Sequence, residues 1–512
     1  METTRILLHP SFNAGPVDPR LFGGFLEHMG RAVYEGVYEP GSRHADADGC
    51  RSDVLAALRR LRMTAMRYPG GNFASGYHWR DGVGPRGERP TVRELAWQSV
   101  EPNAFGTDEF AALCRKMGWA PMLTVNLGTG TPEEARDWVE YCNCPVGTRE
   151  ADRRAANGYP EPHAVKLWCL GNEMDGPWQL GHVPAEQYAI RARQAATMMK
   201  LCDRTIETVV CGSCAPVMPT WMAWDRQVLE HLGDAADYVS LHRYVGNRED
   251  DTPDYLAVTA SIDRQIEEMD AACRFVQARR KSARRAFLCF DEWNVWYRET
   301  GGDGQGKRAP HLIEEVYNLE DALVVAGFLN SFIRHADVVK IANLAQIVNV
   351  IAPLLTRGND LLVQSTFHPF EMMTRRRDGV SLRVAVDAAW QRAVAVRESE
   401  GQRKRAEAGQ VAASSYWAAP PSLELALRDD RLMTANMADE PLVRAVIGER
   451  HRAMRALADV AAFRTLQGTG EPTPIEKQDR LLAALQPLRA LTHAEQVLRV
   501  GVDRLAVGAA IE

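Results

Sequence analysis

Between residues 21 and 346, short apolar runs rich in β-branched residues alternate with longer segments of helical periodicity. The runs are apolar at successive positions, which is typical of strands buried on both faces of a parallel sheet. Eight parallel strands, each followed by a helix, close a barrel. The alternation therefore predicts the α/β class and a (β/α)8 TIM barrel. The predicted strands are residues 21–28, 65–72, 121–127, 165–173, 208–213, 238–244, 286–294 and 338–346.

Helical periodicity between the strands predicts six helices. Asp53 and Thr107 are the predicted N-caps of the first two helices. Thr131 precedes Pro132 and two glutamates, which combines a cap, a proline in the first turn and acids at the positive end of a helix. The predicted helices are residues 53–61, 107–116, 132–141, 185–200, 254–279 and 319–335.

The composition is typical of a soluble globular protein, with 46% apolar and 25% charged residues. No run of about 18 apolar residues occurs, so we expect no membrane span and no membrane partner. The first ten residues contain no apolar stretch of signal-peptide length, which favours a cytoplasmic location. A net charge of −6 without a basic stripe argues against nucleic acid as a partner. The ten cysteines, including those of the Cys211-Gly-Ser-Cys214 motif, are expected to be structural thiols.

Polar residues of catalytic type stand at the ends of most predicted strands. In such barrels the carboxyl ends of the strands face one shared active site. Burying these groups without partners would cost about 1–3 kcal/mol each, which disfavours a purely structural barrel. The strand ends are Glu27-His28, Asn72, Asn126, Asn172-Glu173, His242-Arg243-Tyr244, Asp291-Glu292-Trp293-Asn294 and Gln346.

Two glutamates carry the strongest catalytic signal. Glu173 stands at the end of the fourth predicted strand, in LGNEMDGPW, and Glu292 stands near the end of the seventh, in FDEWN. Strands four and seven lie across the mouth of a barrel, so the two side chains can converge. Glycoside hydrolysis needs such a pair, one carboxyl to protonate the leaving oxygen and one carboxylate to attack the anomeric carbon. The alternative, a solvated loop acid, is less favoured at the end of a buried strand.

Several other side chains have both a functional and a structural interpretation. Asn172 can hold a sugar hydroxyl or form a turn. His242 and Tyr244 lie on the same side of one strand, where a tyrosine hydroxyl could orient a carboxylate, although packing in the core explains the pair equally well. Tryptophans can stack against sugar faces but are more often core residues. The candidates are Trp97, Trp178, Trp293 and Trp296.

The strand-end motifs belong to longer matching stretches. These are FGGFLEHMGRAVYEGVYEPGS, RYPGGNFASGYHWRDGVGP, FGTDEF, LWCLGNEMDGPWQLGH, SLHRY, FDEWNVWY and IANLAQIVNVIAPLLT. In them the chain resembles the intracellular α-L-arabinofuranosidases of glycoside hydrolase family 51. The resemblance runs from about residue 5 to 387. It implies a retaining mechanism on terminal α-L-arabinofuranosyl groups, with no cofactor and no metal.

The resemblance also implies roles for individual residues. Glu173, in GNEMDGPW, corresponds to the general acid/base, and Glu292, in DEWN, corresponds to the nucleophile. Contacts with the substrate are implied for Glu27, Asn72, Trp97, Asn172, His242, Tyr244, Trp296 and Gln346.

The C-terminal region departs from the family pattern. We expect a first strand of an accessory domain within residues 1–17, the catalytic barrel at 18–375 and an atypical region at 376–512. The family carries a β-sandwich there, but the sequence after Asp387 is rich in alanine and arginine, and residues 442–464 and 475–491 predict helices. The tail is either a genuine helical region that replaces the sandwich or the product of a shifted reading frame in the gene. Either explanation puts the sandwich and the family's homo-oligomer in doubt.

The resulting hypothesis is an exo-acting, retaining α-L-arabinofuranosidase that hydrolyses arabinose-containing oligosaccharides in the cytoplasm. One alternative is a retaining endo-β-glucanase or xylosidase on the same barrel, because one fold serves many sugars. The other alternative is a catalytically inactive sugar-binding protein.

Overall fold

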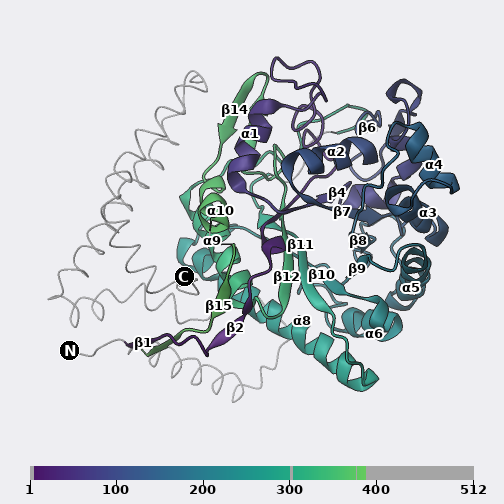
Figure 1. Ribbon diagram of the computed structural model, residues 1–512. Helices are drawn as coiled ribbons and strands as arrows, with labels where there is room; N and C mark the ends of the chain where they lie inside the picture. The colour runs from purple at the N-terminus through teal and green to yellow at the C-terminus, as the bar shows by residue number, and fades with distance from the viewer. Residues whose placement is uncertain (1–4, 300–303, 376, 388–512) are drawn as a thin grey trace, which may run out of the picture. The chain divides into compact units, whose positions relative to one another are not determined.

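The computed structural model describes residues 5–299, 304–375 and 377–387. The chain divides into two units, Ala14–Ser381 and a smaller unit formed by Met1–Asn13 and Leu382–Glu512. The predicted tail helices and the question of the sandwich lie outside the described residues. In the larger unit, eight parallel strands close a barrel that is surrounded by helices (Figure 1). The strands are β3 (Gly23–Phe25), β4 (Ala65–Tyr68), β7 (Ala120–Val125), β8 (Leu167–Leu170), β9 (Glu207–Cys211), β10 (Tyr238–Val245), β11 (Phe287–Val295) and β12 (Val339–Ala345).

All eight predicted barrel strands are confirmed, and they follow one another around the barrel in chain order. β8 and β11 are therefore the fourth and seventh strands, as expected. All four residues of β8 are buried, which explains the continuous apolar run in the sequence. Several strands end earlier than predicted: β4 ends at Tyr68 and β8 ends at Leu170, so Asn72 and Glu173 lie beyond the ends of these strands.

The helices cover the outside of the barrel (Figure 1). The prediction at 254–279 is divided into α7 and α8, and α4, α6 and α10 were not predicted. The helices are α1 (Ser52–Leu61), α2 (Thr107–Met117), α3 (Pro132–Asn143), α4 (Arg149–Ala156), α5 (Ala185–Cys202), α6 (Ala223–Leu232), α7 (Thr252–Ala257), α8 (Thr259–Arg280), α9 (Leu319–Arg334) and α10 (Phe367–Thr374).

One of the three predicted helix caps is confirmed. The Thr131 side chain accepts a hydrogen bond from the backbone N–H of Glu134 at the start of α3. The predictions for Asp53 and Thr107 are wrong, because both residues lie inside the first turn of their helices. Gly106 precedes α2 instead, and its backbone N–H donates to the Glu109 side chain.

The remaining elements are short. β13 (Leu354–Arg357) and β14 (Asp360–Val363) form a hairpin, and β5 (Val92–Arg93) pairs with β6 (Val100–Glu101). β2 (Asn13–Pro16) pairs with β15 (Val380–Leu382). In the smaller unit, β1 (Arg5–Leu7) pairs antiparallel with β16 (Ala385–Asp387), and its place in an accessory domain stays a prediction. The 3-10 turns are Pro19–Phe22, Asn72–Gly76, Trp79–Gly82, Arg86–Glu88 and Gly233–Ala235.

The core has two parts. A large cluster packs the helices against the outside of the barrel; Phe328 and Phe332 of α9 contact Trp293 of β11 there, with ring centroids 5.0 and 5.3 Å away. A smaller cluster, including Met122, Cys169 and Ile341, draws on strands β7 to β12 and fills the barrel interior. All ten cysteines are free thiols. Within the described residues, no helix is long and apolar enough to cross a membrane.

Candidate active site

Glu173 and Glu292 meet at the carboxyl end of the barrel strands. Glu292 lies within β11, and Glu173 follows β8 with a φ of 43°, a left-handed conformation that few non-glycine residues adopt. An oxygen of Glu173 and an oxygen of Glu292 lie no more than 4.8 Å apart. Retaining glycosidases hold their carboxyl groups about 5–5.5 Å apart, whereas inverting enzymes need about 6.5–9.5 Å to admit a water. The spacing therefore fits double displacement.

A β-bulge brings two consecutive acids to the same side of β11. Ser240 of β10 pairs with Cys289, but His242 pairs with Glu292, so β11 has one extra residue between these positions. Neighbouring residues of a regular strand point to opposite faces. Because the bulge breaks this alternation, both Asp291 and Glu292 contact the same arginine inside the barrel.

Glu292 is held by two donors. Arg67 Nη1 lies 2.7 Å from Glu292 Oε1, and the Tyr244 hydroxyl donates to Oε2 over 2.8 Å. Burial raises the pKa of Glu292, and this effect outweighs the opposing charges of His242 and Arg67. The two donors fix the orientation of the carboxylate, and the Arg67 charge works against the burial that raises its pKa.

Glu173 is hydrogen-bonded to His242 and Trp178. His242 Nδ1 lies 2.9 Å from Glu173 Oε1, and the Trp178 indole donates to Oε2 over 2.7 Å. Burial disfavours the charged imidazole, but Glu292 and Asp291 outweigh it and raise the pKa of His242 well above its usual range. Burial raises the pKa of Glu173, but the hydrogen bond and charge of His242 outweigh it and lower that pKa. These two directions place the proton of the pair on His242, next to the Glu173 carboxylate.

Glu27 is a third buried carboxyl group, 3% exposed. Its Oε1 accepts the Phe73 N–H at 3.0 Å and the Trp97 indole N–H at 3.1 Å. Burial, followed by repulsion from Glu292, raises the pKa of Glu27 to about 8. Gly71 permits this placement, since a Cβ there would lie 2.7 Å from Glu27 Oε2. At neutral pH Glu27 is therefore a neutral acid, able to donate a hydrogen bond.

Amide side chains connect the remaining parts of the site. Gln346 Oε1 accepts the backbone N–H of Glu27 at 2.9 Å. Asn172 Oδ1 accepts from Arg67 Nη2 at 2.8 Å, and its amide nitrogen donates to Asn72 Oδ1 over 3.3 Å. These contacts join the ends of β3, β4, β8 and β12 around the two catalytic candidates.

Tryptophans flank the site. Trp97 donates to Glu27, and Trp296 makes an edge-to-face contact with Tyr244, with ring centroids 5.5 Å apart and planes at 86°. Trp178 is 54% exposed beside Glu173. Trp293 is fully buried against α9, so its candidate role in stacking on a sugar is wrong and its core interpretation holds.

The structure brings all ten predicted site residues into one connected set, although their individual roles stay predictions. Sequence reasoning missed Arg67, which is fully buried and contacts Glu292, Asp291 and Asn172. An arginine inside the apolar run Ala65–Tyr68 was the available signal, because a buried charge requires a partner.

Among the described residues, one group has ligand atoms within 4.8 Å of one another, which is close enough to share a metal ion. It consists of Glu173, His242 and Glu292. The carboxylate oxygens of the two glutamates already accept hydrogen bonds from Arg67, Tyr244 and Trp178. A cation there would compete with the Arg67 guanidinium for Glu292. This arrangement suits proton transfer and nucleophilic attack by the same side chains.

A (β/α)8 barrel with two converging carboxyl groups at this spacing defines a glycoside hydrolase of the retaining class. Two family models match the sequence: the alpha-L-arabinofuranosidase 1 domain at residues 57–256 and the alpha-L-arabinofuranosidase C-terminal domain at residues 291–486. The chain belongs to the α-L-arabinofuranosidases of glycoside hydrolase family 51.

Relatives and solved structures support this assignment. The chain is 45% identical over 392 residues to an intracellular exo-alpha-(1->5)-L-arabinofuranosidase of Bacillus subtilis, covering 76% of this chain and 78% of that one. It is 45% identical over 394 residues to an exo-alpha-(1->6)-L-arabinofuranosidase of Bifidobacterium longum, covering 74% and 75%. A family 51 alpha-L-arabinofuranosidase structure from Bifidobacterium longum matches with a TM-score of 0.73 and 39% identity, over 76% and 79%. An arabinose complex of the Thermotoga maritima enzyme matches at 0.69 and 36%, over 75% and 76%.

Glu27→Gln is expected to stabilise the protein more at pH 8 than at pH 5. The folded state holds the Glu27 proton up to a pKa of about 8, whereas an unperturbed glutamate ionises near 4.5. Between these values the folded state binds more protons, so this group makes stability fall as pH rises, by at most about 1.4 kcal/mol per pH unit. Thermal unfolding of both proteins at the two pH values measures the effect. A difference in Tm that does not change with pH would contradict it.

Proposed function

We propose that this chain is a retaining exo-α-L-arabinofuranosidase, which removes terminal non-reducing α-L-arabinofuranosyl residues from arabinose-containing oligosaccharides. The observation that carries the proposal is the meeting of Glu173 and Glu292 oxygens within 4.8 Å in a chain of this family. Curated relatives named as exo-acting arabinofuranosidases support the substrate class.

In the first step, the Glu292 carboxylate attacks the anomeric carbon, and the bond from that carbon to the aglycone oxygen breaks. Glu173 gives the departing oxygen the proton that it draws from His242, its hydrogen-bond partner at 2.9 Å. Arg67 and Tyr244 hold the two Glu292 oxygens, so the attacking lone pair is already oriented when the substrate arrives. The product of this step is an arabinosyl ester of Glu292 and a free aglycone.

In the second step, Glu173 acts as a base. It takes a proton from a water molecule, whose oxygen attacks the anomeric carbon and releases the Glu292 carboxylate. His242, at 2.9 Å from Glu173, can hold the proton that Glu173 gains. Two inversions leave the arabinose with its original anomeric configuration.

Substrate contacts are proposed for the residues that surround the two carboxyl groups. Neutral Glu27 can donate to a sugar hydroxyl, and the amides of Asn72, Asn172 and Gln346 can bind further hydroxyls. Trp97 and Trp296 offer aromatic faces and edges at the sides of the site. Trp178, exposed next to the acid/base, is placed to contact the aglycone.

A cytoplasmic location is part of the proposal. It is supported by the relatives from Bacillus subtilis and Acetivibrio thermocellus, which are named intracellular. The expected partner is the oligosaccharide substrate, with no nucleic acid and no membrane involved. A homo-oligomer as in the family stays a prediction.

Product analysis tests the proposal. We expect arabinose to be released one unit at a time from α-(1→5)- and α-(1→6)-linked arabino-oligosaccharides, with no cleavage of β-glucan or xylo-oligosaccharides. Both linkages must be tested, because one relative is named for the α-(1→5) linkage and another for the α-(1→6) linkage. Internal cleavage of β-glucan or release of xylose would favour the endo-β-glucanase or xylosidase alternative. A folded protein without turnover of any arabinofuranoside would favour a binding protein.

A further inference from the structure

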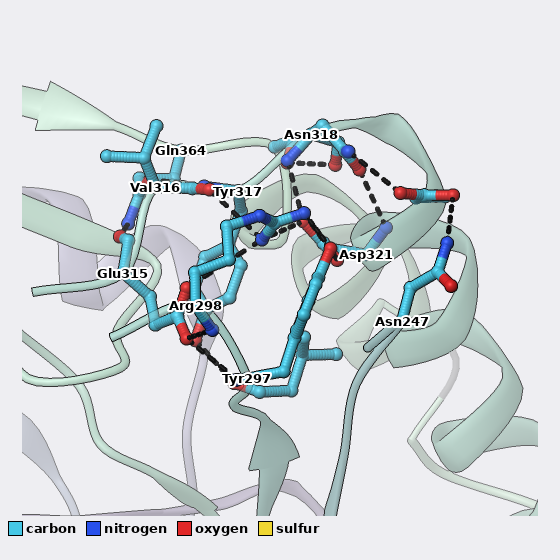
Figure 2. Close-up of polar contacts among 12 residues, drawn as sticks. Asn247, Tyr297, Arg298, Glu315, Val316, Tyr317, Asn318, Asp321 and Gln364 are labelled. Atoms are coloured by element: carbon cyan, nitrogen blue, oxygen red, sulfur yellow. Dashed lines mark hydrogen bonds and ion pairs between the residues drawn. The ribbon is translucent and has the colours of Figure 1, made fainter. Parts of the chain in front are cut away.

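Glu315 is a fully buried carboxylate outside the machinery described above. Its Oε1 accepts three consecutive backbone N–H groups, from Tyr297 at 2.8 Å, Arg298 at 2.6 Å and Glu299 at 3.1 Å. Figure 2 shows Glu315 beside Tyr297 and Arg298. These residues directly follow Trp296, where the chain leaves β11. One side chain therefore fixes the backbone of the loop that leaves the catalytic strand.

Charges on both sides hold this arrangement together. Glu315 Oε2 lies 3.7 Å from Arg298 Nη1, and the same nitrogen lies 3.0 Å from Asp321 Oδ2 in α9 (Figure 2). The Tyr297 hydroxyl donates to Asp321 Oδ1 over 3.2 Å. The loop is thus tied by its backbone to Glu315 and by two of its side chains to α9.

Glu315 is itself held in place. Gln364 donates to the Glu315 carbonyl at 2.9 Å and accepts the backbone N–H of Tyr317 at 3.0 Å. The Tyr317 hydroxyl donates to the carbonyl of Val295, at the end of β11, over 2.7 Å. Because the segment around Glu315 is anchored to the same strand, its carboxylate has a defined position relative to the site.

The loop connects to the nucleophile through two aromatic side chains. The backbone N–H of Trp296 donates to the Val245 carbonyl of β10 over 2.8 Å. The Trp296 ring packs edge-to-face on Tyr244, whose hydroxyl donates to Glu292. A displacement of the loop after Trp296 would therefore reach Tyr244 and then the Glu292 carboxylate.

We infer that Glu315 is a positioning residue for catalysis. By accepting three N–H groups of the loop after Trp296, it holds the Trp296 ring against Tyr244. Tyr244 in turn keeps its hydrogen bond to the nucleophile Glu292. The inference rests on the proposed function, because its effect is read as arabinofuranosidase activity. A carboxylate that only stabilised the fold would lower Tm without acting through Trp296.

A double-mutant cycle separates these two roles. Glu315→Ala, Trp296→Ala and the double variant are compared with the wild type in kcat/KM for an aryl α-L-arabinofuranoside, well below the lowest Tm. We expect Glu315→Ala to lower kcat/KM about tenfold in the wild type and less than about twofold in the Trp296→Ala background. Equal losses in both backgrounds, or no loss in the wild type, would overturn the inference.

Asp237→Ala is the matched control. Asp237 Oδ2 accepts the backbone N–H of Thr208 at 2.8 Å and also pairs with Lys200, but it lies just before β10, at the opposite end of the barrel. We expect this variant to lower Tm with kcat/KM within about twofold of the wild type. A catalytic loss as large as that of Glu315→Ala would show that such losses report destabilisation alone.

Two conservative variants keep the inference testable if Glu315→Ala does not fold. Glu315→Gln retains an oxygen that can accept the three N–H groups, so it should keep at least about half of the wild-type kcat/KM. Glu315→Asp retains the charge but withdraws the carboxylate by one methylene, so it should lose more activity than Glu315→Gln. The reverse order would overturn the inference. A wild type without arabinofuranosidase activity would instead refute the proposed function.

Discussion

Replacing Glu292 with alanine is expected to lower kcat/KM for an aryl α-L-arabinofuranoside by about 10⁴-fold or more. The variant has no group to attack the anomeric carbon, so no arabinosyl-enzyme can form. The side chain is 6% exposed and is held by Arg67 and Tyr244, which leaves little room for another residue to replace it. Steady-state kinetics on purified protein, with circular dichroism to verify folding, measure the effect.

Azide provides a positive test of the same variant. A small anion can enter the space vacated by the carboxylate and attack the anomeric carbon directly, giving an arabinosyl azide of inverted configuration. Glu150→Ala is the matched control, because Glu150 is a buried glutamate of the outer helix α4 that pairs with Arg80. Its kcat/KM should stay near that of the wild type. Activity of Glu292→Ala above about one per cent of the wild type would contradict the assignment.

Replacing Glu173 with alanine is expected to have an effect that depends on the leaving group. Release of an alkoxide from an arabino-oligosaccharide needs a proton, so kcat/KM should fall about 10²- to 10⁴-fold. A 2,4-dinitrophenolate leaves without protonation, so kcat/KM for that aryl arabinofuranoside should change by less than about tenfold. Its kcat should still fall, because the variant lacks the base that activates water in the second step.

His242 gives this prediction a control. Glu173 and His242 are hydrogen-bonded over 2.9 Å, so the rival assignment makes His242 the donor to the aglycone. If His242 were the donor, His242→Ala would show the steep dependence on leaving group and Glu173→Ala would not. Equal losses of Glu173→Ala on both substrates would contradict its role as the acid.

The barrel could be predicted from the sequence because burial on both faces leaves a continuous apolar run. The four residues of β8, Leu167–Leu170, are all apolar and all buried and show this clearly. The sequence marks the boundaries of helices less clearly. α7 and α8 separate at Val258, where neither proline nor glycine marks the break, so one long helix was the natural prediction for residues 254–279.

The site was only partly predictable. The position of Glu173 and Glu292 at strand ends, together with the family resemblance, indicated the catalytic pair. The inward placement of Asp291 beside Glu292 depends on a bulge, which shifts the pairing by one residue and leaves no pattern in the sequence. Glu315 lies in an irregular segment before α9 and not at the end of a strand. No sequence pattern marks it, so its three backbone hydrogen bonds became visible only in three dimensions.

Peptide mapping of a trapped reaction intermediate tests the central claim most directly. The Glu173→Ala variant, mixed with 2,4-dinitrophenyl α-L-arabinofuranoside, should accumulate the covalent enzyme, because the first step is fast and the second lacks its base. After rapid acid quenching and proteolysis, we predict one arabinosyl group, attached to Glu292. Attachment to another residue, or a product of inverted configuration from the wild-type enzyme, would contradict double displacement by this pair.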